Sequence, residues 1–121
     1  MKQVLIVDDS EQIRERLAAM LAESAHIRVV GQAGSLGEAL EVMRRMTPDT
    51  VILDIRLPGR SGLELLKEIK RRYPGTAVIM MTNYDYDRYR QLCKQLGADH
   101  FLNKTLEFEK IVETVTGPPT H

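Results

Sequence analysis

The chain has 121 residues, the size of one ordinary domain, and its 17 basic and 17 acidic residues cancel. A net charge of zero means that the chain lacks the excess of positive charge that attracts nucleic acid or an anionic membrane, so we expect this domain to bind neither directly. The apolar run from Val4 to Val7 is too short for a signal peptide or a membrane span, and the lone Cys93 suits a reducing compartment, so the expected location is cytoplasmic.

The first half of the chain alternates between strand and helix patterns. An apolar run from Lys2 to Val7 predicts a buried strand, and Ser10 then precedes a helical repeat of apolar residues at Ile13, Leu17, Met20 and Leu21. A second strand is predicted from Ile27 to Ala33. Ser35 and Glu38 have the spacing of a capping box at the start of a second helix, which Pro48 ends.

The second half repeats this alternation. Thr50 to Leu53 is a third apolar strand, which ends in Asp54 before a turn at Pro58-Gly59, and Ser61 and Glu64 repeat the capping-box spacing before a third helix. The remaining expected elements are a strand from Ala77 to Met81, a helix with Tyr89, Leu92, Cys93 and Leu96 on one face and Gly97 past its end, and a strand at Phe101-Leu102. A last helix buries Phe108, Ile111, Val112 and Val115.

Five strands that alternate with five helices through short connections predict an α/β fold with a doubly wound five-stranded parallel sheet. We expect the strand order 2-1-3-4-5, one domain over residues 1–116, and a flexible tail or the start of a linker over 117–121. This order makes the first and third strands neighbours, so Asp8, Asp9 and Asp54 meet at one edge of the sheet. Thr82 and Lys104 complete the rim of that edge from the other side.

The predicted acidic edge points to a metal and to phosphoryl chemistry. Carboxylates about 5 Å apart repel by roughly 3 kcal/mol per pair at an effective dielectric of about 20, and a hard divalent cation offsets that repulsion. Mg²⁺ fits better than an all-protein calcium cage, and zinc is disfavoured because no Cys or His joins the cluster. A carboxylate beside Mg²⁺ can attack a phosphoryl group, while Lys104 neutralises the transferred oxygens and Thr82 donates a hydrogen bond.

Together these residues resemble the receiver domains of bacterial two-component response regulators. The resemblance extends from Val4 to about Val115 and rests on motifs that occur in order and register: Asp8-Asp9 after the first strand, Asp54 after the third with Pro58-Gly59 downstream, Thr82 after the fourth and Lys104 after the fifth. It implies the (βα)5 flavodoxin-like fold and a phosphoprotein that acts in signal transduction, within a two-component system or phosphorelay.

The resemblance also implies a role for each site residue. Asp54 accepts the phosphoryl group from a histidine kinase or another phosphotransfer protein. Asp9 binds Mg²⁺ directly, Asp8 binds it mainly through water, and the backbone carbonyl of Arg56 supplies a further ligand. Such a domain is a phosphoacceptor with slow autodephosphorylation and not an enzyme in the metabolic sense.

A conformational switch follows from the same resemblance. Thr82 moves toward the phosphoryl group, and Phe101, three residues before the lysine, turns inward. A downstream protein or an output domain then reads the face made by the fourth helix, fifth strand and fifth helix, and a phosphorylation-dependent dimer is a further expectation.

Three positions depart from the family pattern. Thr105 follows Lys104 where the family usually has a cis proline, Asn83 follows Thr82 where a small residue is common, and Phe101 lacks the hydroxyl of the usual tyrosine. Arg56, Asn83 and Tyr84 are expected to border the mouth of the site as an access gate that slows loss of the phosphoryl group.

Two other function classes are weighed against this one. A small phosphatase that works through an aspartyl phosphate would carry Asp-x-Asp after the first strand and a cap over the substrate, and this chain has neither that spacing at Asp8-Asp9 nor room for a cap. A phosphorylation-independent, receiver-like interaction domain would keep the fold without the chemistry. The complete acid, threonine and lysine set argues against it, whereas Asn83 and Thr105 keep it open.

Overall fold

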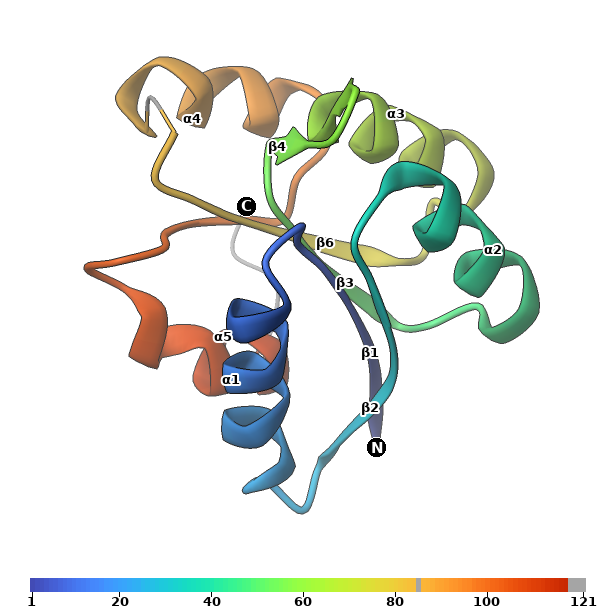
Figure 1. The fold of residues 1–121 in the computed structure, drawn as a ribbon, viewed down its shortest axis with the longest axis vertical. Coiled ribbons are helices and arrows are strands. Elements are labelled where there is room, and N and C mark those ends of the chain that lie inside the picture. Colours follow the sequence, from blue (N-terminus) through green and yellow to red (C-terminus); the bar gives the residue numbers. More distant parts are fainter. Residues whose placement is uncertain (85, 118–121) are drawn as a thin grey trace.

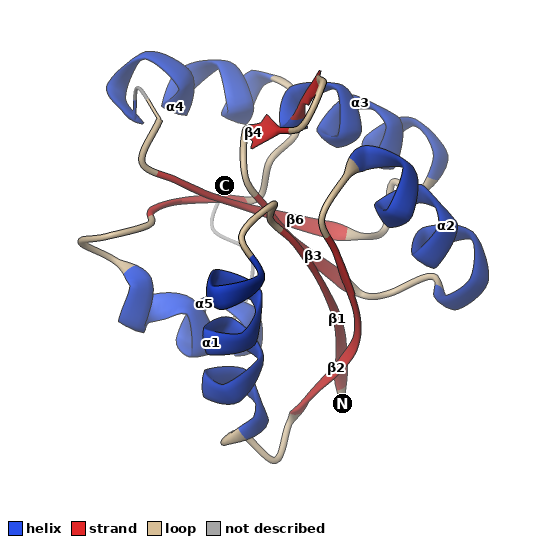
Figure 2. Cartoon of the chain, viewed as in Figure 1, coloured by secondary structure: helices blue, strands red, loops and turns tan. Residues whose placement is uncertain are grey.

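The computed structural model describes residues 1–84 and 86–117, so the predicted tail lies outside the described residues beyond Gly117. The strands are β1 (Lys2–Val7), β2 (Ile27–Ala33), β3 (Thr50–Leu53), β4 (Arg56–Leu57), β5 (Arg60–Ser61), β6 (Ala77–Thr82) and β7 (His100–Asn103). The helices are α1 (Glu11–Ala22), α2 (Leu36–Met46), α3 (Gly62–Arg72), α4 (Tyr86–Gln95) and α5 (Ile111–Thr116), with a 3-10 turn, η1 (Phe108–Lys110), before the last (Figure 2).

The sheet has the topology expected from the sequence. Five parallel strands lie in the order β2-β1-β3-β6-β7, which confirms the doubly wound 2-1-3-4-5 arrangement. Helices α1 and α5 cover one face, and α2, α3 and α4 cover the other (Figure 1). Val7 pairs with Leu53, and Leu53 pairs with Met80, so the central strands end side by side. The residues that follow these strands therefore meet at one edge.

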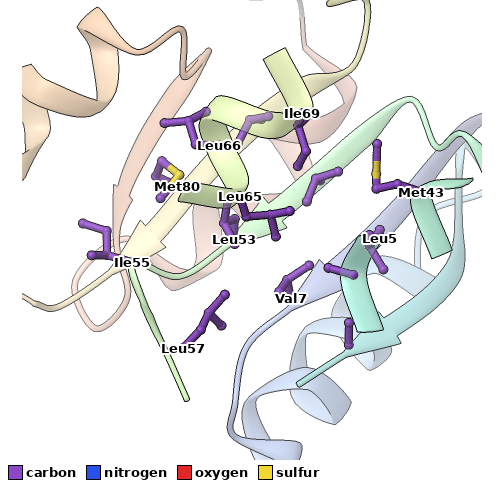
Figure 3. Close-up of a cluster of buried hydrophobic side chains, with 14 of the residues drawn as sticks. Leu5, Val7, Met43, Leu53, Ile55, Leu57, Leu65, Leu66, Ile69 and Met80 are labelled. Atoms are coloured by element: carbon purple, nitrogen blue, oxygen red, sulfur yellow. The ribbon is translucent and has the colours of Figure 1, made fainter. Parts of the chain in front are cut away.

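Each face of the sheet has its own hydrophobic core. Successive residues of a central strand alternate between the two cores, which is why β1 is apolar from Val4 to Val7 and β3 from Val51 to Leu53. The core under α2 and α3 contains Leu5, Val7, Leu53, Met80, Leu65, Leu66 and Ile69, most of which point toward one another in Figure 3. The core under α1 and α5 contains Val4, Ile6, Ile52, Ile79, Leu17, Leu21 and Ile111.

Two helices differ in detail from the sequence prediction. Leu92 and Cys93 were expected on one face of α4, but 38% of Leu92 is exposed, whereas the adjacent Cys93 is fully buried. The helix therefore packs through a narrower stripe than its apolar residues indicate. At α3, the Ser61 hydroxyl oxygen accepts the amide of Leu63 at 3.1 Å, and the capping box is not formed because Glu64 pairs with Arg60 instead.

A short antiparallel hairpin, β4–β5, was not predicted from the sequence. Its strands have only two residues each and flank Gly59, which has a positive φ of 68°. Elements of this length are too short to give an alternating pattern. The last helix also begins differently, because Phe108 lies in the 3-10 turn and α5 starts only at Ile111. Among the described residues, no helix is long and apolar enough to cross a membrane.

Candidate functional site

The acidic residues are fixed by the ends of the two central strands. The amide of Asp8 donates to the carbonyl of Ala33 at 3.0 Å, and the amide of Asp54 donates to the carbonyl of Val7 at 3.2 Å. These bonds extend the sheet by one residue and set the direction in which each carboxylate leaves it. Asp8 and Asp54 are buried, whereas Asp9 is exposed. One carboxylate oxygen from each of the three lies within 4.8 Å of the others.

Lys104 joins this cluster from the end of β7. Its Nζ lies 2.6 Å from Asp8 Oδ2 and 2.6 Å from Asp54 Oδ2, so one ammonium pairs with two carboxylates. The backbone amide of Lys104 donates to the carbonyl of Thr82 at 3.1 Å, which holds the residue beside the end of β6. Three carboxylates and one ammonium leave a formal charge of −3 + 1 = −2. Oxygen donors with this residual charge fit a hard divalent cation such as Mg²⁺.

Burial and pairing shift the protonation of two site residues. Desolvation raises the pKa of Asp8 above its ordinary value, and this effect outweighs the hydrogen bond from Lys104. Burial by itself lowers the pKa of Lys104, but the hydrogen bonds and negative charges of Asp54 and Asp8 outweigh it, and the pKa is raised. Lys104 therefore remains an ammonium at neutral pH, and a cation beside Asp8 would favour the ionised form of its carboxyl.

The turn after β1 is held by further hydrogen bonds. The carbonyl of Asp8 accepts a bond from the Arg14 guanidinium at 2.6 Å, and Asp8 Oδ1 accepts the amide of Ser10 at 2.9 Å. Ser10 in turn caps α1, since its hydroxyl oxygen accepts the amide of Ile13 at 3.3 Å. Sequence reasoning missed Arg14. The sequence marks Arg14 only as a basic residue directly after Ile13, which does not indicate a contact with the turn after β1.

The segment after Asp54 forms one wall of the site. The amide of Arg56 donates to Asp54 Oδ1 at 3.3 Å, and the amide of Gly62, the first residue of α3, donates to the carbonyl of Ile55 at 2.5 Å. A cavity of about 440 Å³ opens beside the carboxylates and is lined by Asp9, Asp54, Arg56, Leu57 and Pro58. The β4–β5 hairpin thus brings Arg56 to the mouth of the site.

The two residues expected to switch lie on the neighbouring strands β6 and β7. Thr82 is buried at the end of β6, and its Oγ1 accepts the amide of Tyr84 at 3.1 Å. Phe101 pairs with Met80 in the register of β6 and β7 and packs, partly buried, against the core under α2 and α3. Thr82 therefore borders the acidic edge, whereas Phe101 lies further back along the neighbouring strand.

Two pairs of side chains occupy the rim where the access gate was expected. The guanidinium of Arg56 lies over the ring of Tyr84, 4.7 Å from its centroid, and that ring stacks on Tyr89 at 5.6 Å. Asn83 binds Thr105 instead: Asn83 Nδ2 donates to Thr105 Oγ1 at 2.6 Å, and the Thr105 amide donates to Asn83 Oδ1 at 3.0 Å. The Lys104–Thr105 peptide is trans, like the other peptide bonds described.

Fold and site together define a doubly wound α/β domain with an acidic, lysine-paired site at the carboxyl edge of its sheet. Residues 4–116 match the family model for the response regulator receiver domain. The chain therefore belongs to the response regulator receiver domain family.

Relatives support this assignment. The chain is 32% identical over 115 residues to the response regulator GacA of Pseudomonas aeruginosa, covering 95% of this chain and 54% of that protein. It is 36% identical over 115 residues to an uncharacterized response regulatory protein of Vibrio cholerae, covering 95% of this chain and 47% of that protein. The chain thus spans about half the length of the curated relatives it matches.

Solved structures show the same fold. The response regulator domain of Thermotoga maritima CheB is 30% identical, with a TM-score of 0.83 and coverage of 93% of this chain and 89% of that one. The receiver domain of NtrX from Brucella abortus is 31% identical, with a TM-score of 0.76 and coverage of 92% and 98%.

Proposed function

We propose that this domain accepts a phosphoryl group on Asp54 from the phosphohistidine of a histidine kinase or phosphotransfer protein, in a Mg²⁺-dependent reaction. The observation that carries the proposal is the placement of Lys104 Nζ at 2.6 Å from both Asp54 and Asp8, inside a cluster of three carboxylates. This arrangement holds a nucleophilic carboxylate, a cation for the transferred oxygens and a set of hard oxygen ligands within one site.

In the proposed reaction a carboxylate oxygen of Asp54 attacks phosphorus and forms the new P–O bond. The P–N bond to histidine breaks, its electron pair leaves with the ring, and the imidazole departs neutral when its other nitrogen carries a proton. The product is an aspartyl phosphate. The Arg56 amide and the Lys104 ammonium each hold one oxygen of Asp54, which orients the nucleophile before the attack.

The metal would be held by the carboxylates of Asp8, Asp9 and Asp54 and by the backbone carbonyl of Arg56. When bound, Mg²⁺ supplies positive charge beside the oxygens of the transferred group. Lys104, whose Nζ lies 2.6 Å from Asp54 Oδ2, would provide a second positive charge, and Thr82 would donate its hydroxyl to a phosphoryl oxygen after the loop beyond β6 moves inward.

Readout is proposed on the face formed by α4, β7 and α5. A cavity of about 520 Å³ on this face is lined in part by Arg90, Lys94 and Phe101, so the residue proposed to turn inward reaches the surface there. An output domain, a downstream protein or a second copy of the domain would bind this face in the phosphorylated state. The proposed location is the cytoplasm, in keeping with the buried, unpaired thiol of Cys93.

Phosphorylation with a small donor tests the proposed function. After incubation with acetyl phosphate and Mg²⁺, the intact mass of the wild type should rise by one phosphoryl group, and Asp54→Asn should show no increase. Asp49→Asn is the matched control, because Asp49 is an exposed acid at the opposite end of β3 and its loss should leave the labelling unchanged. Labelling that persists in Asp54→Asn contradicts the assignment of Asp54. A wild type that accepts no phosphoryl group would favour the phosphorylation-independent interaction domain.

A further inference from the structure

The side chains of Asn83 and Thr105 connect the two loops that carry Thr82 and Lys104. Asn83 Nδ2 donates to Thr105 Oγ1 at 2.6 Å, and the Thr105 amide returns a bond to Asn83 Oδ1 at 3.0 Å. Each residue directly follows a residue of the proposed phosphorylation site. The pair therefore links the loop after β6 to the loop after β7.

This pair continues the pairing of two strands beyond the end of the sheet. The last backbone bond between the strands runs from the Lys104 amide to the Thr82 carbonyl at 3.1 Å. The carboxamide of Asn83 has the donor and acceptor of a peptide group, so it supplies one more connection where the backbones separate. Asn103 Oδ1 also accepts the Thr105 amide, at 2.9 Å, which holds Thr105 in its turn.

We propose that Asn83 and Thr105 are positioning residues that latch the loop after β6 in its unphosphorylated position. The inference rests on the proposed function, in which Thr82 must move toward a phosphoryl group on Asp54. In this structure Thr82 Oγ1 instead accepts the amide of Tyr84 at 3.1 Å, and Asn83 lies between these two residues.

The latch resists that movement because its other end is fixed. Lys104, next to Thr105, is paired with both Asp8 and Asp54. An inward shift of Thr82 and Asn83 therefore breaks the bonds to Thr105 or pulls Thr105 away from Asn103. If a ligand binds only when the loop has shifted, its apparent Kd is its intrinsic Kd divided by the fraction of molecules with a shifted loop. A latch that lowers this fraction therefore weakens binding.

The expected effect is a gain in affinity for a phosphoryl mimic when the latch is removed. Beryllofluoride with Mg²⁺ serves as the probe, and its binding is measured by titration. Asn83→Ala removes both bonds and should tighten binding about three- to tenfold, the range expected for one or two exposed hydrogen bonds. Thr105→Val removes one bond and should tighten binding by less. Thr105→Ser keeps both groups and should retain the wild-type affinity.

A double-mutant cycle tests whether Asn83 and Thr105 act on binding through each other. A separate control tests whether losing any threonine hydroxyl changes binding. In the Asn83→Ala background, Thr105→Val should change the affinity no further, because its partner is already absent. Thr114→Val is the control for loss of a threonine hydroxyl, since Thr114 Oγ1, on α5, donates to the carbonyl of Lys110 in η1 and not to either residue of the latch. Its affinity for beryllofluoride should equal that of the wild type.

The ligand-free protein gives a second readout. The Thr105 amide should exchange with solvent only slightly faster in Asn83→Ala than in the wild type, because Asn103 Oδ1 still accepts it at 2.9 Å. Equal or weaker beryllofluoride binding by Asn83→Ala overturns the latch while leaving the proposed function intact. A wild type that binds no beryllofluoride overturns the proposed function and the latch together.

Discussion

Gly62, the first residue of α3, lies so close to Asp54 that a β-carbon at Gly62 would be 1.9 Å from the Asp54 carbonyl oxygen. No side chain fits at that separation, and the clash is with backbone that cannot turn aside. The contact anchors the start of α3 against the residue proposed to accept the phosphoryl group. A glycine is therefore required at this position for close approach, whatever its helix propensity.

Gly62→Ala should lower the free energy of unfolding by about 1–3 kcal/mol, the usual cost of overpacking, and should slow phosphorylation of Asp54. Gly37→Ala is the matched control, because Gly37 also lies in a first helical turn but a β-carbon there would contact nothing within 4 Å. That variant should be slightly stabilised. Urea denaturation of both proteins measures the difference, and equal stabilities would contradict the close contact.

Asp8→Asn should raise the melting temperature of the metal-free protein by on the order of a few degrees. Because burial raises the pKa of Asp8, its ionised form is less favourable in the folded protein than in the unfolded chain. Wild-type stability should consequently fall as the pH rises from the ordinary value of 3.8 through the raised pKa, and the variant should lack this component. Melting curves across this pH range in the presence of a chelator provide the test. A lower melting temperature for Asp8→Asn would show that its pairing with Lys104 outweighs burial.

Millimolar Mg²⁺ should raise the melting temperature of the wild type, because a ligand bound only by the folded state stabilises it, by about 2.7 kcal/mol at a hundredfold excess over Kd. Asp9→Ala should lose most of this response. Glu11→Ala serves as the control, since Glu11 is a nearby exposed acid outside the carboxylate cluster, and its response should be unchanged. A wild-type melting curve that ignores Mg²⁺ would rule out a metal site at the acidic edge.

The phosphoryl group on Asp54 should persist for hours, and Tyr84→Ala and Arg56→Asn should each shorten its lifetime. The Arg56 guanidinium over the Tyr84 ring stands at the mouth of the site, where water must approach in line with the phosphoryl bond. Misplacing a nucleophile by about 1 Å can cost on the order of a hundredfold in rate. Tyr89→Phe keeps its ring stacked on Tyr84 and should not change the lifetime. Single-turnover phosphate release measures the effect, and a half-life under a minute in all these proteins would refute the gate.

The sequence was sufficient to predict how Asp8, Asp9, Asp54 and Lys104 come together. The pair Asp8-Asp9 and the single Asp54 follow apolar runs, and Lys104 stands two residues after Leu102. Because parallel strands end at a shared carboxyl edge, this local pattern predicts that the four residues meet. The strand order then followed from the alternation of strands and helices. No measurement of ligand binding was needed to place these four side chains.

Other features of the site depend on loop geometry that no periodic pattern encodes. The bond between Asn83 and Thr105 joins positions 22 residues apart, and both side chains lie on exposed loops. The contact of Gly62 with Asp54 depends on the two-residue strands β4 and β5, which are too short to recognise. The exposure of Leu92 could not be predicted, because helical spacing alone does not reveal how wide a stripe of the helix the sheet covers.

The apolar residues that stabilise the fold lie in the two cores, apart from the residues expected to control the lifetime of the phosphoryl group. Leu5, Leu53 and Met80 lie in one core and Ile6 and Ile52 in the other, while the rim of the acidic edge is made of loop residues that belong to neither. Changes at the rim should therefore alter how long the proposed aspartyl phosphate survives without loosening the scaffold. Within such an architecture, the persistence of a signal can evolve almost independently of the protein that carries it.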